Sequence, residues 1–445
     1  MTPSPANLET PADRARFVRA RLPEAGFFSG HEWRVSPTPF RLSPELAREL
    51  EDLGRLLLQF NRSVNLLYRQ SLAGRQPSWV AGWLDQGKPA AVLEAQRNAI
   101  FKNDLPRVIR PDIILTENGP RITELDSVPG GIGLTAWLNQ TYDAMQNGGA
   151  PVVGGAKGMT QGFAGIFDDA PGVNIVISEE AQTYRPEMDW LAGQLGGRFQ
   201  VRDGRFADFK NGEAVYRFFE LFDLPNVPNS KQIIDTALAG GIRLTAPPKP
   251  IFEEKMLFGL LWNRHLRGFW RQELGERFFE RLQGLAPYTW IVDPTPLPPQ
   301  GALPELGLTD WQQLKAFSQR ERELILKVSG FSEKAWGARG VHLGSDLSTA
   351  DWAAAVDGAI ASFPTSPYVL QRYHKPALVQ AQWFDFEKNQ AVDMPGRVRL
   401  CPYYFVVGKG DGARANLSGV LATICPADKK IIHGMSTAIL APCSS

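Results

Sequence analysis

Residues 110–131 read RPDIILTENGPRITELDSVPGG, and this stretch decides which fold the sequence favours. Two apolar runs flank Asn118-Gly119, a dipeptide typical of the turn in a β-hairpin. Charged residues recur at alternate positions, as R-x-D before the turn and E-x-D after it. The stretch therefore predicts a hairpin whose charges follow the two-residue period of a strand.

The length of the turn decides whether these charges share one face of the hairpin. A two-residue turn would pair Ile113 with Glu124 and put Asp112 on the other face. A three-residue turn, Asn118-Gly119-Pro120, would pair Asp112 with Asp126 and put all four charges on one face. Because proline lacks the N–H that a strand residue donates, we expect Pro120 to belong to the turn.

Three carboxylates on one face repel each other unless a cation lies between them. Mg²⁺ prefers hard oxygen ligands and commonly completes its shell with phosphates and water, so Asp112, Glu124 and Asp126 are candidate metal ligands. Arg110 beside them is a candidate for stabilising a transferring phosphoryl group. A charged hairpin at the solvated edge of a sheet is the alternative that the residues leave open.

The composition is that of a globular protein and limits its partners. A length of 445 residues suits two or three domains, with 43% hydrophobic and 21% charged residues. A net charge of +1 offers no general attraction for nucleic acid or an anionic membrane. Three widely spaced cysteines argue against a disulfide framework, and the sequence has no export-type or membrane-spanning apolar run. We expect a cytoplasmic protein.

The apolar pattern predicts an α/β chain with four regions. Residues 1–105 are mainly helical, and Ser43 is a candidate N-cap for a long amphipathic helix. Residues 106–165 contain the hairpin, and residues 166–248 alternate strands and helices in the manner of a Rossmann-like domain. Residues 249–445 contain two notable lysines, a glycine-containing loop and a strand-rich tail.

Two lysines lie where they could bind phosphates. Lys327 ends the apolar strand ELILKVSG, where Ser329 and Gly330 lead into a loop whose backbone N–H groups could approach an anion. Lys255 begins the amphipathic helix of KPIFEEKMLFGLLW. The order of a Walker A motif is missing, and a solvated lysine beside a turn is the simpler alternative.

Further residues of the loop and tail complete the candidate site. They are Gly337 and Gly340 for the nucleotide, Gln371 and Tyr373 for its adenine, and Lys334, Arg339 and Arg414 for the substrate.

Taken in order, R-x-D…E-x-D, x-x-K-M-L-x-x-L-L-W, I-L-K-x-x-x-G…G-x-R-G and Y-x-L-Q resemble the synthetase domain of glutathionylspermidine synthetases. That family has the circularly permuted ATP-grasp fold, in which the acidic residues precede the lysines, as they do here. The resemblance implies that Arg110 and the three carboxylates hold the reacting phosphates with two Mg²⁺ ions. It further implies that Lys255, Lys327 and the glycine loop cover ATP.

The sequence departs from the family pattern at several positions. Asp126 stands where the family usually has asparagine, Val328 replaces a proline, and the loop has an insertion before Gly337. These departures leave open which loop residue, Lys334 or Arg339, meets the substrate.

Together, the motifs and the resemblance predict an ATP-dependent carboxylate–amine ligase that forms an amide through an acylphosphate. Its substrates would be a small-molecule acid and a small-molecule amine of unknown identity. Two alternatives stay open: a non-catalytic ATP-grasp protein that binds a nucleotide, and a phosphotransferase with a non-amine acceptor.

Overall fold

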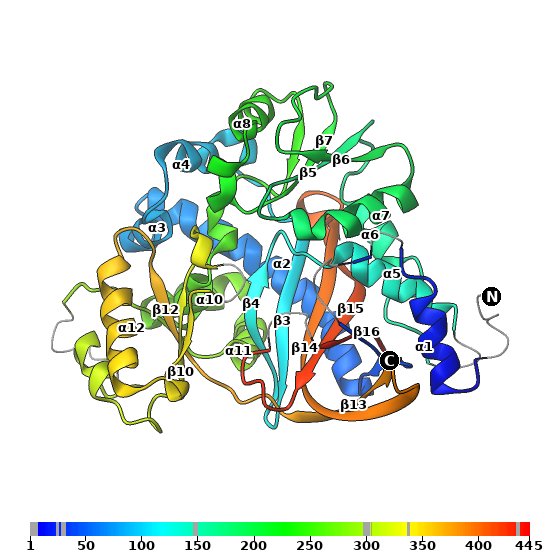
Figure 1. Ribbon diagram of the computed structural model, residues 1–445. Coiled ribbons are helices and arrows are strands. Elements are labelled where there is room, and N and C mark those ends of the chain that lie inside the picture. The colour runs from blue at the N-terminus through cyan, green and yellow to red at the C-terminus, as the bar shows by residue number, and fades with distance from the viewer. Residues whose placement is uncertain are drawn as a thin grey trace. The chain divides into compact units, whose positions relative to one another are not determined.

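The computed structural model describes residues 8–23, 26–27, 33–145, 150–296, 303, 305–335, 339–432 and 437–445 (Figure 1). The chain divides into two compact units. Unit 1 comprises Met1–Leu58, Asn103–Pro247 and Pro376–Ser445, and unit 2 comprises Gln59–Lys102 and Pro248–Lys375. The four regions expected from the sequence are a finer division and stay a prediction.

The long helix α2 (Pro44–Leu72) continues from unit 1 into unit 2. It begins as the sequence predicts, because Ser43 Oγ accepts a hydrogen bond from Leu46 N at 3.2 Å. Leu50, Leu53 and Phe60 on its apolar stripe are fully buried. The amphipathic pattern and the N-cap are thus both confirmed.

Unit 1 contains an eight-stranded sheet in which the hairpin lies at one end of the strand order. The order is β1-β16-β15-β14-β3-β4, with β13 paired to β14 and β2 paired to β16. In Figure 1 the cyan strands β3 and β4 lie beside the orange β14, although they are far apart in the sequence. The strands are β1 (Arg34–Val35), β2 (Phe40–Arg41), β3 (Val108–Thr116), β4 (Gly119–Asp126), β13 (Leu378–Asp385), β14 (Gln390–Val407), β15 (Arg414–Pro426) and β16 (Ile439–Ser444).

A second sheet of unit 1 has the order β6-β5-β7-β8, and all of its neighbouring strands are parallel. Parallel neighbours need crossover connections, and helices supply them here. The strands are β5 (Val173–Ile177), β6 (Phe199–Asp203), β7 (Ala214–Phe218) and β8 (Arg243–Thr245). The strands and helices expected over residues 166–248 are present, while a Rossmann-like domain with these bounds stays a prediction.

Helices pack between and beside the two sheets of unit 1. Phe163 of α6 lies 5.1 Å from the ring of Tyr216 in the parallel sheet and 6.2 Å from that of Phe405 in the large sheet. All three residues belong to one apolar core. The helices of this unit, besides α2, are α1 (Pro11–Arg19), α5 (Ile132–Asp143), α6 (Gly158–Gly165), α7 (Arg185–Leu195) and α8 (Ser230–Leu238).

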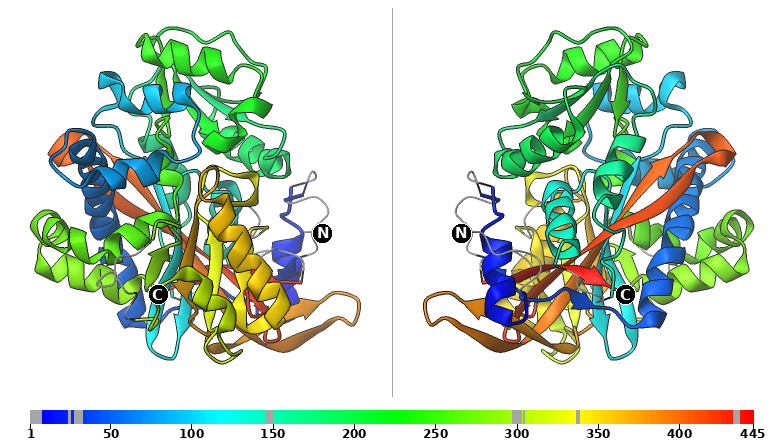
Figure 2. Two further views of the ribbon diagram at one scale, coloured as in Figure 1. Left: turned by 90° about the vertical axis from the view of Figure 1, so that its left-hand side faces the viewer. Right: turned by 90° about the vertical axis from the view of Figure 1, so that its right-hand side faces the viewer.

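Unit 2 contains a four-stranded antiparallel sheet of order β11-β10-β12-β9. Figure 2 shows α12 lying along this sheet. The strands are β9 (Thr289–Ile291), β10 (Leu324–Val328), β11 (Val341–Leu343) and β12 (Tyr368–Arg372). The helices are α3 (Ser78–Asp85), α4 (Ala90–Arg97), α9 (Met256–Trp262), α10 (Arg267–Leu274), α11 (Glu276–Leu285) and α12 (Thr349–Ser362).

The alternation of side chains along β10 and β12 assigns the two faces of this sheet. Leu324, Leu326 and Leu370 share a core with Trp352 of α12. Because side chains alternate with period two, Lys327 and Gln371 belong to the opposite face.

Two expectations from composition can be compared with the structure. Cys401, Cys425 and Cys443 are buried free thiols, as their spacing predicts. Among the described residues, no helix combines the length and the apolar character needed to cross a membrane.

Candidate active site

The hairpin of β3 and β4 has a different register from the one predicted. Thr116 pairs with Gly119, so the turn consists of Glu117-Asn118 and Pro120 lies in β4 opposite Leu115. The predicted three-residue turn is therefore wrong. The physical reason is that β4 ends the strand order, and an edge strand tolerates a residue without an N–H.

Local hydrogen bonds fix this shorter turn. Thr116 Oγ1 accepts a hydrogen bond from Asn118 N at 3.2 Å and donates one to Gly119 O at 2.6 Å. Gly119 has a φ of +89°, a backbone conformation that residues other than glycine rarely adopt. The Asn-Gly dipeptide thus marks the position of the turn. The turn itself begins one residue earlier than expected, at Glu117.

A β-bulge nevertheless brings the four charges to one face. The pairing shifts by one residue beside Thr123, whose Oγ1 donates to Asp112 O at 3.2 Å. Asp112 consequently lies opposite Glu124, and Arg110 lies opposite Asp126. Directly opposed residues point to the same side of a sheet, so the predicted shared face is confirmed with different partners.

The charges of this face form a buried ion-pair cluster. Arg110 Nη2 lies 3.1 Å from Asp112 Oδ1 and 3.1 Å from Asp126 Oδ2. Asp112 Oδ2 lies 3.0 Å from Arg399 Nη1 of β14, and Cys401 Sγ lies 3.5 Å from Asp112 Oδ1. The exposed fractions are 14% for the Arg110 side chain and 8% for that of Asp112. The hairpin is at the edge of its sheet, but this part of it is not a solvated surface.

Burial and neighbouring charges act in opposite directions on these groups. Burial alone would lower the pKa of Arg110, but the carboxylates of Asp112 and Asp126 outweigh it and raise that pKa well above its ordinary value. The pKa of Arg399 is raised in the same way by Asp112, against its own burial. Burial raises the pKa of Asp126, and Arg110 opposes that rise. Both arginines therefore stay positively charged and do not release a proton.

Strand β14 supplies functional candidates that the sequence analysis missed. Arg399, Cys401 and Tyr403 occur at alternate positions and reach the hairpin side of the sheet, where Tyr403 Oη donates to Gly130 O at 2.7 Å. The signal that could have found them is the period-two pattern R-x-R-x-C-x-Y within residues 397–403.

The Pro-Gly-Gly that closes the opening stretch positions the helix after the hairpin. Glu187 of α7 accepts hydrogen bonds from Gly131 N at 2.7 Å and from Leu134 N at 2.8 Å, which caps the start of α5. Burial raises the pKa of Glu187 to about 7, although these N–H groups oppose the rise. Gly131 has a φ of +85°, and a Cβ there would lie 2.5 Å from Tyr403 Oη. This position therefore requires glycine.

The carboxylates of this cluster do not form a resident metal site. Arg110 occupies the position between Asp112 and Asp126 that a metal ion would need. Within the described ranges, no group of three or more His, Cys, Asp or Glu side chains could hold a metal ion. The donor set as described does not fit a resident Mg²⁺.

In unit 2, Lys327 and Gln371 come together as buried neighbours on β10 and β12. Lys327 Nζ donates to Gln371 Oε1 at 3.0 Å, and Gln371 Nε2 donates to Thr289 Oγ1 at 3.1 Å. Lys327 is 7% exposed and Gln371 is 3% exposed. Tyr373 follows the end of β12, where its N donates to Glu323 O at 3.0 Å. An ammonium and an amide are thus held at one position on the sheet.

Ser329 joins the end of β10 to the start of α9. Its carbonyl accepts from Lys255 N at 2.9 Å, and its Oγ accepts from Met256 N at 2.9 Å and donates to Glu254. Glu254 in turn pairs with Lys88 at 2.6 Å, and both side chains are fully buried. Ser329 therefore has a clear structural role in addition to any contact with a nucleotide.

The loop after Ser329 packs back on the start of α9. Lys255 Nζ donates to Ala335 O at 3.2 Å, and Gly340 N donates to Lys334 O at 2.8 Å. A Cβ at Gly340 would lie 2.8 Å from Lys334 O, and one at Gly330 would collide with Glu253 O. Both glycines are therefore required by close backbone packing.

The remaining candidate residues are exposed or lie outside the described residues. The side chains of Lys334 and Arg339 are exposed, and Gly337 lies outside the described residues. Arg414 is exposed at the start of β15, opposite Val407, whereas Arg399 pairs with Thr423 of the same strand. At about 3.3 Å per residue the two positions are roughly 30 Å apart, so Arg414 is not brought to the carboxylate cluster.

The architecture is mixed α/β and is consistent with an ATP-grasp type of fold. The particular likeness is to a glutathione synthetase-like effector from Globodera pallida in its apo form, with a TM-score of 0.51 and 10% identity over 94% of this chain and 92% of that one. A chain from Methylobacillus flagellatus assigned as a gamma-glutamylcysteine synthetase gives a TM-score of 0.39 at 10% identity, over 90% of this chain and 89% of that one. No protein-family model and no curated protein matches the sequence. The likeness to the effector shows the fold alone.

Proposed function

We propose that this protein is an ATP-dependent carboxylate–amine ligase that forms an amide bond through an acylphosphate. The observation that carries the proposal is the buried cluster of Arg110 and Arg399 with the carboxylates of one hairpin face. The likeness in fold to a glutathione synthetase-like effector supports the same class of reaction. The motifs also resemble those of glutathionylspermidine synthetases, and we propose that family for this protein.

In the proposal, the hairpin of unit 1 stabilises the transferring phosphoryl group. Arg110 carries a permanent charge in a largely buried position, where electrostatic stabilisation is stronger than in water. Arg399 lies on the other side of Asp112 and would hold that carboxylate in place. Removing either arginine would leave carboxylates with less charge compensation.

In unit 2, Lys255 and Lys327 would neutralise the phosphates of ATP. The Lys327 ammonium donates to an uncharged amide oxygen, an acceptor that a phosphate oxygen could replace. Gln371 and Tyr373 would recognise adenine, and Ser329, Gly330, Gly337 and Gly340 belong to the loop proposed to cover the nucleotide. Lys334, Arg339 and Arg414 stay proposals for contacts with the acid or the amine.

Mg²⁺ enters this proposal as part of the substrate MgATP. Asp112, Glu124 and Asp126 lie on the face that also carries Arg110 and would face the metal of MgATP, whereas a direct bond to it would require Arg110 to leave its position between Asp112 and Asp126. Because Arg110 already neutralises two of them, we derive no step from a metal ion resident in the protein.

The reaction takes place in two bond exchanges. An oxygen of the substrate carboxylate forms a bond to the γ-phosphorus of ATP, and the bond to the bridging oxygen breaks to release ADP. The amine nitrogen then forms a bond to the acyl carbon, loses a proton to solvent or a base, and inorganic phosphate leaves. The protein contributes positioning, charge neutralisation and exclusion of water, which would otherwise hydrolyse the acylphosphate.

The test measures ADP release from MgATP with pairs of candidate acids and amines. Arg110→Lys keeps the charge but loses the fork that reaches two carboxylates, so we expect turnover to fall by about 100-fold. Arg121→Lys is the matched control, because it changes a hairpin arginine that bonds only to Pro120 O at 2.8 Å in the described contacts. Equal turnover in parent and Arg110→Lys would remove Arg110 from the mechanism.

One observation favours a second candidate, a non-catalytic protein that binds a nucleotide. The mutual neutralisation of Arg110, Asp112 and Asp126 is also what a purely structural cluster would show. Tight binding of ATP without ADP release for any acid and amine pair would support it. ADP release that needs an acceptor without an amine would instead indicate a phosphotransferase.

A further inference from the structure

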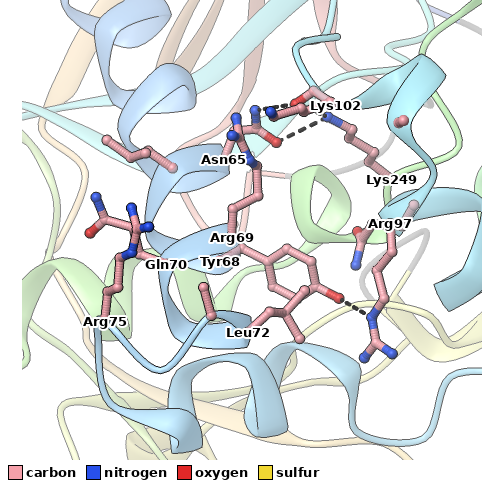
Figure 3. A pocket seen from close by; sticks show the side chains of 13 residues that line it. Asn65, Tyr68, Arg69, Gln70, Leu72, Arg75, Arg97, Lys102 and Lys249 are labelled. Atoms are coloured by element: carbon pink, nitrogen blue, oxygen red, sulfur yellow. Dashed lines mark hydrogen bonds between the residues drawn. The ribbon is translucent and has the colours of Figure 1, made fainter.

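Unit 2 contains a pocket of about 510 Å³ whose wall carries several cations (Figure 3). It is lined by residues of the second half of α2, of α4 and the turn that follows it, and by Lys249. No acidic residue is among those that line it. The lining cations are Arg69, Arg75, Arg97, Lys102 and Lys249. A concave wall with one sign of charge concentrates anions.

Gln96 contributes a buried hydrogen-bond donor to this wall. It is 4% exposed, and its Oε1 accepts from Ile251 N at 3.2 Å, which fixes the orientation of the amide. Its Nε2 is buried and has no hydrogen-bond partner among the described residues. A buried donor without an acceptor is destabilising, so an anionic oxygen in the pocket would supply the missing acceptor.

Lys249 lies in the wall of the pocket and donates to two uncharged oxygens. The residue is 2% exposed, and its ammonium donates to Asn65 Oδ1 at 3.0 Å and to Lys102 O at 3.4 Å, as Figure 3 shows. Asn65 Nδ2 also donates to Lys102 O at 3.0 Å. A buried cation held in this way is stabilised further by a nearby anion.

Arg97 and Tyr68 are also held rigidly. Arg97 Nη2 lies 2.5 Å from Asp85 Oδ2, and its Nε donates to Tyr68 Oη at 3.1 Å. Tyr68 Oη donates to Asp85 Oδ1 at 2.7 Å. The ring of Tyr68 thus stands in the wall with Leu66 and Leu72, which gives the pocket an apolar part beside its cations.

We propose that this pocket binds a phosphorylated small molecule that carries at least two negative charges. The phosphate oxygens would accept from the amide of Gln96 and lie among the cations, and the remainder of the ligand would contact Tyr68 and the leucines. None of the pocket residues belongs to the set proposed for ATP, so this inference is independent of the proposed ligase reaction. The pocket is a binding site in addition to that function.

The experiment titrates the full-length protein with sodium tripolyphosphate by isothermal calorimetry, without ATP and with a chelator present. We expect a saturable site whose dissociation constant rises at least about tenfold in Arg69→Gln/Lys102→Gln, since two of the cations are removed. Arg277→Gln is the matched control, because it removes an exposed cation on α11 of the same unit. Its affinity should stay within about twofold of the parent.

A second variant tests the buried donor directly. Gln96→Glu keeps the acceptor for Ile251 N and replaces the free donor by an acidic oxygen, so binding should weaken by at least about tenfold. Circular dichroism checks that each variant is folded, and the charge variants decide the outcome if Gln96→Glu is not.

Three outcomes would overturn the proposal. Parent-like affinity in Arg69→Gln/Lys102→Gln would show that the probe does not use this pocket. Tighter binding of citrate than of tripolyphosphate would exclude a site selective for phosphate. Loss of the titration in Lys327→Met would assign the probe to the strands β10 and β12 instead.

Discussion

Two buried cations, Arg110 of unit 1 and Lys327 of unit 2, are held in different ways. In the hairpin of unit 1, Arg110 lies 3.1 Å from each of two carboxylates and is neutralised within the protein. On β10 of unit 2, Lys327 donates to the uncharged amide oxygen of Gln371. In the hairpin the cation lies between two carboxylates, whereas Lys327 donates to an amide oxygen that a phosphate oxygen could replace.

This difference indicates that one cation serves mainly the stability of the fold and the other mainly the binding of a ligand. A cation between carboxylates is part of what allows those carboxylates to be buried, so its removal destabilises the fold. A buried lysine costs stability through desolvation, and a bound phosphate would offset part of that cost. The loss of the cation should therefore act mainly on stability for Arg110 and mainly on ATP binding for Lys327.

The largest effect is expected for Arg110→Ala. It leaves Asp112 and Asp126 buried without the cation between them, so the free energy of unfolding should fall by about 3–5 kcal/mol. Urea denaturation at pH 7 measures this change. Arg121→Ala in the same hairpin should change the free energy of unfolding by about 0.5 kcal/mol or less. If both variants behave alike, the cluster does not stabilise the hairpin.

The next effect concerns the pH dependence of unit 1. Burial raises the pKa of Glu187 to about 7 in the folded protein, so folding favours its protonated form. The resulting stability is fully present below the ordinary glutamate pKa and is lost as pH rises through about 7, by roughly 3 kcal/mol in total. Glu187→Gln should remove this slope between pH 5 and pH 7 in denaturation experiments. A slope that persists in the variant would assign it to other groups.

A smaller effect on stability but a clear effect on binding is expected for Lys327→Met. Removing a buried ammonium should change the free energy of unfolding by no more than about 1 kcal/mol, while ATP affinity falls at least about tenfold. Lys315→Met is the control, since Lys315 forms a partly exposed ion pair with Asp357. A large loss of stability in Lys327→Met, with ATP affinity unchanged, would make Lys327 a structural residue like Arg110.

The smallest effect is expected for Arg414→Ala. The residue is exposed and lies far along β15 from the position that pairs with Arg399. We expect ADP release within about twofold of the parent at saturating substrates. A loss of tenfold or more would establish Arg414 as a substrate contact despite its position.

The sequence predicted most of what depends on local pattern. The strands and helices over residues 166–248 and the helix that starts after Ser43 both follow from short-range periodicity. The shared face of the hairpin charges was also predicted, although its explanation by the turn was wrong.

What the sequence did not predict depends on pairing between distant segments. Arg399 meets Asp112 because β14 pairs with β3, and Glu187 reaches Gly131 because α7 packs on α5. Neither contact can be predicted from the pattern of a few consecutive residues. The bulge at Thr123 is similarly invisible, because it depends on the register of both strands at once.

That bulge changes how this architecture should be recognised in other sequences. The spacing from Asp112 to Glu124 is 124 − 112 = 12 residues, and one of them is the bulged Thr123. A chain that lacked the bulge and had one residue fewer would present the same charges on the same face. A fixed-spacing motif would miss that chain and would accept another in which the spacing is kept but the acidic pair points away. Homologues are therefore better sought by strand register than by residue count.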